Sequence, residues 1–290
     1  MQRLKGKIAI VTGATRGAGR GIACMLGEAG ATVYCTGRSV RGNPATGNRP
    51  ETIEETAEMV NSYGGVGIPV QVDHTVEEQV KSLIERVKQE QGHLDLLVND
   101  VWGGDELTES KPFWEHSLQK GLLMQQRAVH SHLITSHYAV PLMVEQGHGL
   151  VIEVTDGDTF AYRGNLFYDL AKISVIRLAY AMAEELRPYN ITALALTPGF
   201  LRSEAMLDHF GVTEENWQDA AKQDPHFIAS ETPYYIGRAV AALASDPMVS
   251  KKSGSVLSTW NLAPEYNFID IDGRQPNWGK YFDENVANQG

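Results

Sequence analysis

Residues 7–19 read K-I-A-I-V-T-G-A-T-R-G-A-G, an apolar run that passes directly into a glycine-rich turn. The run I-A-I-V is apolar at successive positions, which is typical of a parallel strand covered on both faces of its sheet. Glycines at 13, 17 and 19 allow a tight turn and a close backbone approach to a pair of phosphates. A helix beginning near Gly17 would point its free N–H groups and positive dipole end at those phosphates. The stretch therefore predicts a strand, a phosphate-binding turn and a helix.

Beyond this stretch, short apolar runs alternate with longer helical patterns along most of the chain. The expected strands are 7–11, 31–35, 67–72, 94–98, 150–154, 192–197 and a last one near 255–258. The expected helices are 17–29, 50–63, 76–91, 114–146, 168–186 and 232–244. Such regular alternation predicts an α/β fold with a doubly wound parallel sheet, a Rossmann fold with helices on both faces.

The composition limits the possible partners. A chain of 290 residues suits one large α/β domain or two small ones, and 42% hydrophobic residues can fill a sizeable core. The net charge is −11 and the isoelectric point about 5.3. Nucleic acids and anionic membranes both select basic patches, so we expect neither as a partner.

The start of the sequence and its cysteines indicate a cellular setting. No long apolar run precedes the glycine turn, and no run approaches the ~18 residues of a membrane span, so we expect neither signal peptide nor transmembrane helix. Cys24 and Cys35 lie in apolar segments without metal-ligand spacing. Buried small residues are the expectation for both, rather than a disulfide or a metal site. A reducing, cytoplasmic setting fits these features.

The end of the second expected strand carries information about the cofactor. An NAD site usually places Asp or Glu here to bind the ribose 2′-hydroxyl. This chain has C-T-G-R-S at 35–39, with Arg38 and no acid. A guanidinium can bind a 2′-phosphate through two hydrogen bonds, and Arg16 in the glycine turn is a second candidate for the same charge. The sequence thus favours NADP(H).

Tyr168 and Lys172 stand four residues apart in Y-D-L-A-K, which places both side chains on one face of a helix. A phenol has a pKa of ~10, and a neighbouring ammonium favours its ionised form. The pair therefore indicates a proton donor for a carbonyl oxygen. Taken alone, this spacing more often marks solvated helix neighbours, and its weight comes from its position behind a glycine-rich turn.

These features resemble the short-chain dehydrogenase/reductase family over about residues 5–260. The run 12–19 matches the family's T-G-x-x-x-G-x-G turn, and Tyr168 with Lys172 matches its Y-x-x-x-K pair. The resemblance implies that Thr155, Tyr168 and Lys172 are catalytic, with Thr155 standing where the family has a serine. The residues expected to bind the cofactor are Gly13, Thr15, Arg16, Gly17, Ala18, Gly19, Arg38, Asp73, Asn99, Tyr168, Lys172, Pro198, Gly199 and Ser203.

Several of these roles come only from the resemblance. Asp73 matches the family's adenine-contacting acid, and Asn99 the first residue of its N-N-A-G element. Pro198, Gly199 and Ser203 resemble a P-G-x-x-x-T element that lines the nicotinamide. Lys172 is expected to hold the nicotinamide ribose. Asp156 is a rival to Thr155, although its carboxylate would repel a developing oxyanion.

The chain also departs from the family pattern. The N-N-A-G element is replaced by N-D-V-W-G-G, which introduces Asp100 and Trp102. The family's helix asparagine, which anchors a water relay to the lysine, aligns near Ala128, and no asparagine occurs from 100 to 164. Gln126 and His130 are the nearest polar substitutes, but ordinary helix residues are the expectation for both. The glycine-rich segment with which sequences of the family commonly end is absent from residue 258 onward.

Together these observations predict an NADP(H)-dependent oxidoreductase that acts on a carbonyl/alcohol pair, with Tyr168 as general acid or base. An alternative is an NADP-binding redox sensor on the same fold with little turnover. An enoyl reductase is disfavoured because those members space the tyrosine and lysine more widely. A serine hydrolase is disfavoured because no G-x-S-x-G occurs.

Other expectations concern the surroundings of the site. An apolar pocket is expected to be lined by Trp102, Gly103, Phe160, Tyr162, Phe167, Phe200 and Met206. The resemblance implies a homo-dimer or homo-tetramer through helices 114–146 and 168–186. Residues 1–262 are expected to form the domain, with 263–290 an extension on the same domain or at a subunit contact. The segment 39–50 is expected to be a surface loop, with a flap over the cofactor as the alternative.

Overall fold

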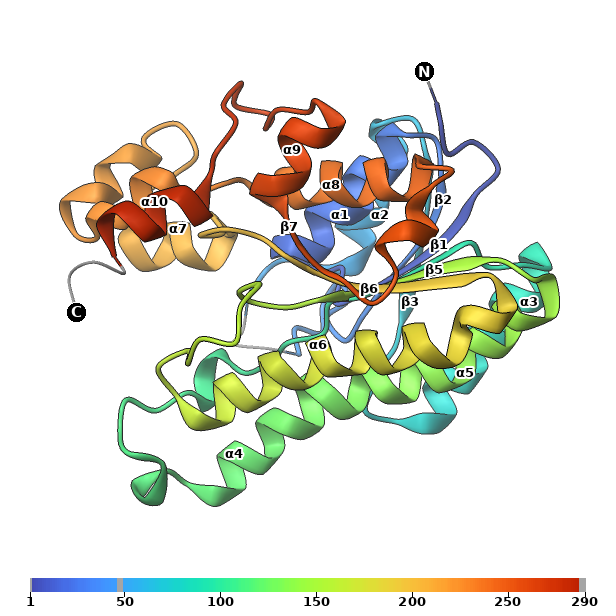
Figure 1. The fold of residues 1–290 in the computed structure, drawn as a ribbon, viewed down its shortest axis with the longest axis horizontal. Coiled ribbons are helices and arrows are strands. Elements are labelled where there is room, and N and C mark those ends of the chain that lie inside the picture. Colours follow the sequence, from blue (N-terminus) through green and yellow to red (C-terminus); the bar gives the residue numbers. More distant parts are fainter. Residues whose placement is uncertain (1, 46–48, 287–290) are drawn as a thin grey trace.

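A parallel sheet of seven strands forms the centre of the computed structural model, which describes residues 2–45 and 49–286 (Figure 1). The strands lie in the order β3-β2-β1-β4-β5-β6-β7. Their bounds are β1 Ile8–Thr12, β2 Thr32–Gly37, β3 Val66–Gln71, β4 Leu96–Asn99, β5 Gly149–Val154, β6 Ile191–Thr197 and β7 Val256–Ser258. Every expected strand is present, and the doubly wound α/β fold is confirmed.

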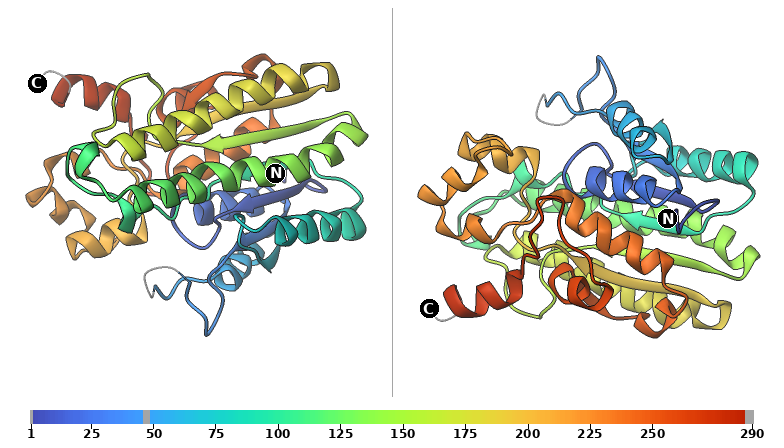
Figure 2. Two further views of the ribbon diagram at one scale, coloured as in Figure 1. Left: turned by 90° about the horizontal axis from the view of Figure 1, so that it is seen from below. Right: turned by 90° about the horizontal axis from the view of Figure 1, so that it is seen from above.

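Helices cover both faces of the sheet (Figures 1 and 2). On one face lie α1 Gly17–Glu28, α2 Ile53–Ser62, α8 Pro233–Ser245 and α9 Thr259–Tyr266. On the other lie α3 Glu77–Gln91, α4 Leu118–Gln125, α5 Ser131–Gln146 and α6 Leu166–Leu186. Two further helices, α7 Glu204–Phe210 and α10 Trp278–Asn285, lie beyond the carboxyl ends of the strands. Short 3₁₀ turns occur at Asp105–Leu107, Phe113–Glu115, Arg187–Tyr189, Trp217–Lys222, Pro225–Ala229 and Val249–Lys252.

The strand β1 shows why the apolar run at the start of the chain becomes a central strand. All five of its residues are buried. Ile8 and Ile10 pack in the core shared with α3, α5 and α6, whereas Ala9 and Val11 pack in the core shared with α1 and α8. Successive side chains of a strand point to opposite faces, so a strand covered on both faces is apolar at successive positions, as Ile8–Val11 are.

The long helix expected at 114–146 begins later and is interrupted. A 3₁₀ turn occupies Phe113–Glu115, and the Ser117 side chain then accepts the N–H of Lys120, which caps α4 at its start. A π-helical turn at Gln126–His130 separates α4 from α5. A π turn inserts one residue into the helical ladder, and such turns are frequent at functional sites.

The sequence did not predict α7, α9 and α10, because helices of about two turns give too little periodicity. The C-terminal segment contacts the main body through several side chains. Arg274 donates to the carbonyl of Ser230, Tyr235 donates to the carbonyl of Pro276, and Trp278 packs edge-on against Phe200. Residues 287–290 lie outside the described part of the chain.

The segment after β2 has little regular structure. Val40 and Asn43 form an isolated bridge, and Ser39 Oγ accepts the N–H of Ala45. Residues 46–48 of the expected loop lie outside the described residues. Over 2–45 and 49–286, no helix has both the length and the apolar character that crossing a bilayer requires.

Cys24 and Cys35 are buried with free thiols, which confirms the expectation for both. Burial raises the pKa of the Cys24 thiol to about 12. Neither side chain is therefore a reactive thiolate at neutral pH.

Helices α1 and α8 approach each other so closely that two glycines form their contact. A β-carbon at Gly21 would lie 1.9 Å from the carbonyl oxygen of Pro233, and one at Gly237 would lie 2.4 Å from the carbonyl oxygen of Gly21. Only glycine allows this approach. The contact fixes α1, whose first turn carries the glycine-rich segment.

Replacing Gly21 with alanine should therefore destabilise the protein. The added methyl group must push α1 from α8, and overpacking of this kind costs about 1–3 kcal/mol. The free energy of unfolding in urea measures the effect. Lys81→Ala, on the exposed side of α3, is the control and should stay within about 0.5 kcal/mol of wild type. Equal stability of the two variants would contradict the close packing.

Candidate active site

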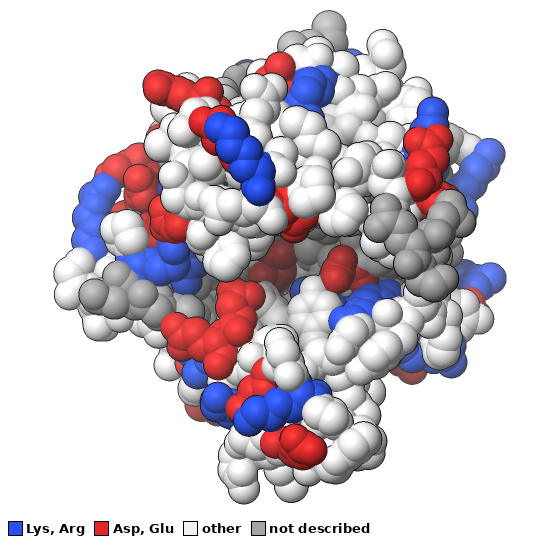
Figure 3. All heavy atoms as spheres, turned by 90° about the vertical axis from the view of Figure 1, so that its left-hand side faces the viewer, with Lys and Arg blue, Asp and Glu red and all other residues white. Residues whose placement is uncertain are grey.

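The candidate residues gather at the edge of the sheet where the parallel strands end. Figure 3 views the molecule from this side, where the surface is hollowed and both acidic and basic side chains surround the hollow. In open α/β sheets, ligands bind outside the carboxyl ends of the strands. The expected residues follow β1, β2, β3, β4, β5 and β6, or lie on the helices that begin there.

The glycine turn packs directly on the loop that follows β4. A β-carbon at Gly13 would lie 2.5 Å from the carbonyl oxygen of Asp100, and one at Gly19 would lie 2.4 Å from the carbonyl oxygen of Gly13. Gly13 and Gly17 also have positive φ angles of 68° and 56°. Thr15 and Ala18 are buried in the same turn. The glycines thus allow the backbone of the turn to pack closely at the start of α1, where side chains at positions 13 and 19 would not fit.

A carboxylate occupies the N-terminus of α1. Glu204, the first residue of α7, accepts the N–H of Gly17 at 2.8 Å through Oε2, and its Oε1 lies 3.6 Å from Arg20 Nη1. Helix N-termini attract anions through their free N–H groups and dipole. The sequence reasoning missed Glu204, although an acid directly after Ser203 was visible.

Helix α7 is also tied to the segment before α2. Asp208 lies 2.8 Å from Arg49, whose guanidinium also binds Glu51 at 2.6 Å. Arg16 Nη1 lies 3.3 Å from Glu51 Oε2. These ion pairs hold α7 across the mouth of the glycine turn.

Arg38 and Asp73 meet at the ends of β2 and β3. Arg38 Nη1 lies 3.9 Å from Asp73 Oδ2, and both side chains are about 30% exposed. Although burial alone would raise it, hydrogen bonds from the hydroxyl and N–H of Thr75 lower the pKa of Asp73. A groove of about 720 Å³ adjoins the pair, and Gln71 and Arg86 also line it.

Asn99 lies in a buried polar network behind the site. Its amide nitrogen donates to Ser136 Oγ at 2.9 Å and to Glu153 Oε1 at 2.8 Å. His132 lies 2.6 Å from Glu153 Oε2 through Nδ1, and 2.9 Å from the carbonyl oxygen of Val101 through Nε2. The network joins β4, β5 and α5, and it fixes the start of the loop that carries Trp102. His132 and Glu153 were not predicted from the sequence, because they lie on different elements, α5 and β5, and share no motif spacing.

Tyr168 and Lys172 lie on one face of α6, as their spacing predicts, and Trp102 covers them. The ammonium of Lys172 lies 4.2 Å from the centre of the Trp102 ring, and that ring meets Tyr168 edge-on at 5.2 Å. Loss of water around it lowers the pKa of Lys172, which Asp156, Asp100 and Asp105 partly counteract. An ammonium over an indole face is a favourable cation–π contact.

The partner of the Tyr168 hydroxyl is Asp156. Tyr168 Oη donates to Asp156 Oδ2 at 2.7 Å. Burial first, and then the Asp156 carboxylate, raise the pKa of Tyr168 above its ordinary value. The expectation that Lys172 lowers this pKa is therefore wrong for this arrangement, because the nearest charge to the phenol is negative.

Among the described residues, no hydrogen bond joins Thr155 to the Tyr168 hydroxyl. Its own hydroxyl donates to the backbone carbonyl of Lys172 at 2.8 Å. Asp156, and not Thr155, is therefore the hydrogen-bond partner of the Tyr168 hydroxyl, while the choice of Thr155 over Asp156 for contact with the substrate oxygen stays a prediction. Thr155 instead joins the end of β5 to the backbone of α6.

Asp100 adds another carboxylate beneath the site. Its own N–H donates to Thr12 Oγ1 at 3.0 Å, which fixes its backbone beside β1. Burial raises the pKa of Asp100 to about 7, which nearby Lys172 and His132 oppose. A β-carbon at Gly19 would lie 2.9 Å from Asp100 Oδ2, so the carboxylate rests on the first turn of α1.

The region of the missing asparagine is the π-helical turn at Gln126–His130. Ala128 is buried, whereas Gln126 and His130 are both exposed. The two polar residues therefore point away from the protein interior, in agreement with an ordinary helix role.

The P-G element is held by a buried acid. Gly199 donates its N–H to Glu231 Oε2 at 2.9 Å, and Thr259 donates to the same oxygen at 2.7 Å. Burial raises the pKa of Glu231 to about 8. Pro198 precedes this contact, and Ser203 caps α7 by accepting the N–H of Met206.

The expected apolar pocket is not assembled as one surface. Trp102 and Phe167 pack on α6 and α4, but Phe160 and Tyr162 are 91% and 67% exposed. Phe200 and Met206 belong to a separate cluster around Phe227, and Gly103 accepts a hydrogen bond from Arg127. The positions of aromatic residues near the motifs did not predict the pocket, because their loops direct these side chains to different parts of the structure.

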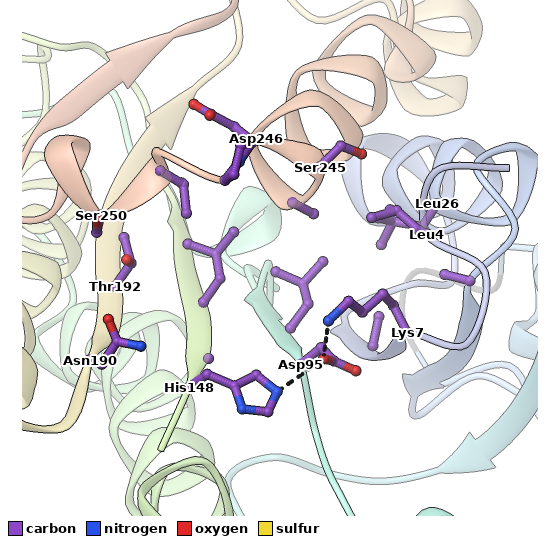
Figure 4. A pocket seen from close by; sticks show the side chains of 18 residues that line it. Leu4, Lys7, Leu26, Asp95, His148, Asn190, Thr192, Ser245, Asp246 and Ser250 are labelled. Atoms are coloured by element: carbon purple, nitrogen blue, oxygen red, sulfur yellow. Dashed lines mark hydrogen bonds and ion pairs between the residues drawn. The ribbon is translucent and has the colours of Figure 1, made fainter. Parts of the chain in front are cut away.

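An open pocket of about 390 Å³ lies at the opposite edge, near the amino ends of β1, β4, β5 and β6 (Figure 4). Asp95 forms its polar wall, with Lys7 Nζ at 2.8 Å and His148 Nε2 at 3.3 Å. Although burial opposes them, the bonds from Lys7 and the N–H of Ile8 lower the pKa of Asp95. These polar groups satisfy one another and anchor the sheet edge.

Comparison with known proteins gives consistent relatives. The model of the short chain dehydrogenase family matches residues 7–210. "Dehydrogenase/reductase SDR family member 1" of Mus musculus is 38% identical, over 93% of this chain and 85% of that protein. The 7alpha-hydroxysteroid dehydrogenase of Clostridium sardiniense is 29% identical, over 85% and 89%. Among solved structures, hydroxysteroid dehydrogenase from Escherichia coli has a TM-score of 0.72 at 25% identity, over 89% and 97%.

Replacing Glu204 with glutamine should tighten binding of the expected dinucleotide. The carboxylate bonded to Gly17 competes with a pyrophosphate for the start of α1, so its removal should lower the Kd for NADPH about tenfold, or ~1.4 kcal/mol. Fluorescence titration with NADPH and ADP-ribose measures this. Adenosine 2′-phosphate, which lacks a pyrophosphate, should bind both proteins equally.

Glu215→Gln is the matched control, because Glu215 is exposed after α7. An unchanged Kd for ADP-ribose in the Glu204 variant would show that the carboxylate does not occupy the pyrophosphate position.

Proposed function

Because this chain belongs to the short-chain dehydrogenase/reductase family, we propose that it is an NADP(H)-dependent oxidoreductase acting on a carbonyl/alcohol pair. The observation that carries the proposal is the position of Tyr168 and Lys172, side by side on α6 at the carboxyl edge of the sheet. The family relation supports an oxidoreductase that uses a nicotinamide cofactor. A matched relative is named as a hydroxysteroid dehydrogenase, which supports an alcohol or ketone as the reacting group.

The residues at the glycine turn fit a dinucleotide. The N–H of Gly17 already binds an anionic oxygen, that of Glu204. Gly13 and Gly19 pack so closely on neighbouring backbone that neither position could carry a side chain. In our proposal Gly13, Thr15, Arg16, Gly17, Ala18 and Gly19 hold the pyrophosphate side. Asp73 holds the adenine, and Asn99, Pro198, Gly199 and Ser203 line the path to the nicotinamide. When bound, the cofactor supplies the hydride.

Preference for NADP(H) is supported by Arg38. It follows β2 at the position where an NAD site carries an acid, and it lies beside the groove next to Asp73. A guanidinium there can bind a 2′-phosphate. Arg16 is the second candidate, although its contact with Glu51 must then be exchanged for the phosphate.

The chemistry assigned to the chain is proton transfer. Tyr168 donates its phenolic proton to the substrate oxygen as the carbonyl carbon gains the hydride. Lys172 binds the ribose hydroxyls. For this its ammonium either moves away from the Trp102 ring or binds the hydroxyls while it stays over that ring. In our proposal the Thr155 hydroxyl also donates to the substrate oxygen, in exchange for its hydrogen bond to the backbone carbonyl of Lys172.

A second candidate function is an NADP-binding sensor with little turnover. Two observations favour it: Glu204 competes for the phosphate position, and Asp156 engages the hydroxyl of Tyr168. The intact Tyr168–Lys172 pair favours the enzyme, because a sensor needs no proton donor. Turnover of any ketone or alcohol distinguishes the two.

We also propose that the protein forms a homo-dimer or homo-tetramer through α4, α5 and α6. These helices carry large apolar side chains that are still 42–57% exposed in the single chain: Leu118, Leu122, Leu133, Leu170 and Tyr180. Residues 263–286 are proposed to complete the same domain, because Arg274 and Trp278 contact its main body.

Replacing Arg38 with alanine should weaken NADPH binding far more than NADH binding. A charge-assisted contact with the 2′-phosphate is worth ~1.5–3 kcal/mol, and NADH lacks that phosphate. Fluorescence titration of both cofactors measures the difference. Arg41→Ala, exposed on the same segment, is the control. Equal affinity of the wild-type protein for NADPH and NADH would refute the proposed preference.

Replacing Tyr168 with phenylalanine should abolish turnover and leave cofactor affinity nearly unchanged. General acid catalysis is worth ~100-fold or more in rate, whereas the phenol contributes little to dinucleotide binding. Initial rates of NADPH oxidation with a ketone, together with the Kd for NADPH, test this. If the variant keeps most of its activity, Tyr168 is not the acid.

A further inference from the structure

The contact between Tyr168 and Asp156 is part of a built loop. Arg163, whose side chain is only 9% exposed, lies at the centre of residues 156–165. Its guanidinium donates to the carbonyl oxygens of Asp156, Ala161 and Thr159, and it pairs with the Asp169 carboxylate at 3.0 Å. The backbone of the loop that carries Asp156 is thereby held around the Arg163 guanidinium.

A second tie fixes the same loop to the sheet. Gly157 donates its N–H to Thr197 Oγ1 at 2.8 Å, at the end of β6. Asp156 itself follows Thr155 at the end of β5. Its carboxylate is therefore held at the Tyr168 hydroxyl by both neighbours in the chain and by Arg163.

We propose that Asp156 is a positioning residue that holds the Tyr168 hydroxyl as a hydrogen-bond donor and keeps it protonated through neutral pH. The consequence is that the pH range in which Tyr168 acts as a base is displaced to alkaline values. This inference rests on the proposed function, in which Tyr168 exchanges the proton with the substrate.

The charges that face the phenol support this assignment. Asp156 lies at hydrogen-bond distance, and Asp105, from the 3₁₀ turn after β4, adds a second negative charge. Arg163 opposes them but is engaged with the loop carbonyls and Asp169. Lys172 Nζ lies 5.6 Å from the centre of the Tyr168 ring, and nearer to Trp102. The negative charge is thus the closest, and it disfavours a phenolate.

The effect on the reaction follows from proton balance. In reduction, the carbonyl carbon gains the hydride of NADPH and the oxygen gains the Tyr168 proton. A C–H and an O–H bond form, the Tyr168 O–H bond breaks, and water returns a proton to the phenolate. In oxidation, the alcohol gives a hydride to NADP⁺ and its proton to a Tyr168 that is already ionised. Only oxidation requires that Tyr168 lose its proton beforehand.

The sign of the pH effect is then determined. Burial and the Asp156 carboxylate raise the pKa of Tyr168. The phenolate fraction increases with pH up to that raised pKa, so the rate of oxidation should still be rising at pH ~10 in the wild-type protein. Removal of the Asp156 charge should lower the pKa of Tyr168. The rate of oxidation should then reach its plateau at a lower pH.

The test is Asp156→Asn, which keeps a hydrogen-bond acceptor and removes the charge. We expect the pH profile of kcat/KM for alcohol oxidation to move to lower pH by about one to three units. The Kd for NADP⁺ should be unchanged. Asp158→Asn, a carboxylate two residues along the same loop, is the matched control and should keep the wild-type profile.

Superimposed profiles of Asp156→Asn and the wild-type protein, with folding and cofactor affinity intact, would overturn the proposal. If the asparagine variant does not fold, Asp156→Ser removes the same charge with a smaller side chain, and the same comparison applies. Failure of the proposed function is distinguishable, because it appears as activity retained in Tyr168→Phe. An inactive Tyr168→Phe with an unshifted Asp156→Asn profile refutes only the role of Asp156.

Discussion

All the strands of the central sheet run in one direction, and this constraint places the candidate site. The carboxyl ends of parallel strands share one edge, so residues at about 13, 38, 73, 99, 155 and 199 meet there although the sequence separates them widely. The continuous apolar run that is buried on both faces of β1 agrees with that direction, because parallel strands need crossover connections, and helices in those connections cover both faces. The close contact of Gly21 in α1 with Pro233 and Gly237 in α8 then holds α1 in place against α8.

Carboxylates occupy several positions where the proposed chemistry involves charge. Glu204 binds the start of α1, Asp156 binds the Tyr168 hydroxyl, and Asp100 rests beneath the glycine turn. Each is favourable locally, since a helix N-terminus and a hydroxyl donor both stabilise an anion. Under the proposed function, Glu204 lies where a pyrophosphate would bind, and Asp156 holds the hydroxyl that exchanges the proton.

The sequence predicted more of the fold than of the contacts. Motif residues such as Gly13, Gly17 and the Tyr168–Lys172 pair could be named as candidates because their motifs depend on spacing along one element. Glu153, His132 and Glu204 were not found, because their partners come from distant segments. The contact of Asp156 with Tyr168 was not predicted for the same reason: its orientation depends on Arg163, whose hydrogen bonds to the loop carry no periodic pattern.

By itself the sequence determined the parallel α/β architecture, the glycine-rich turn at the start of the first helix and the helix face that carries Tyr168 and Lys172. These follow from hydrophobic period and glycine position, which are local properties of the chain. Only the tertiary structure decided which charge lies nearest the phenol, where the Lys172 ammonium rests and what binds the start of α1. Electrostatic interactions depend on distances between segments far apart in the chain, and those distances exist only once the chain has folded.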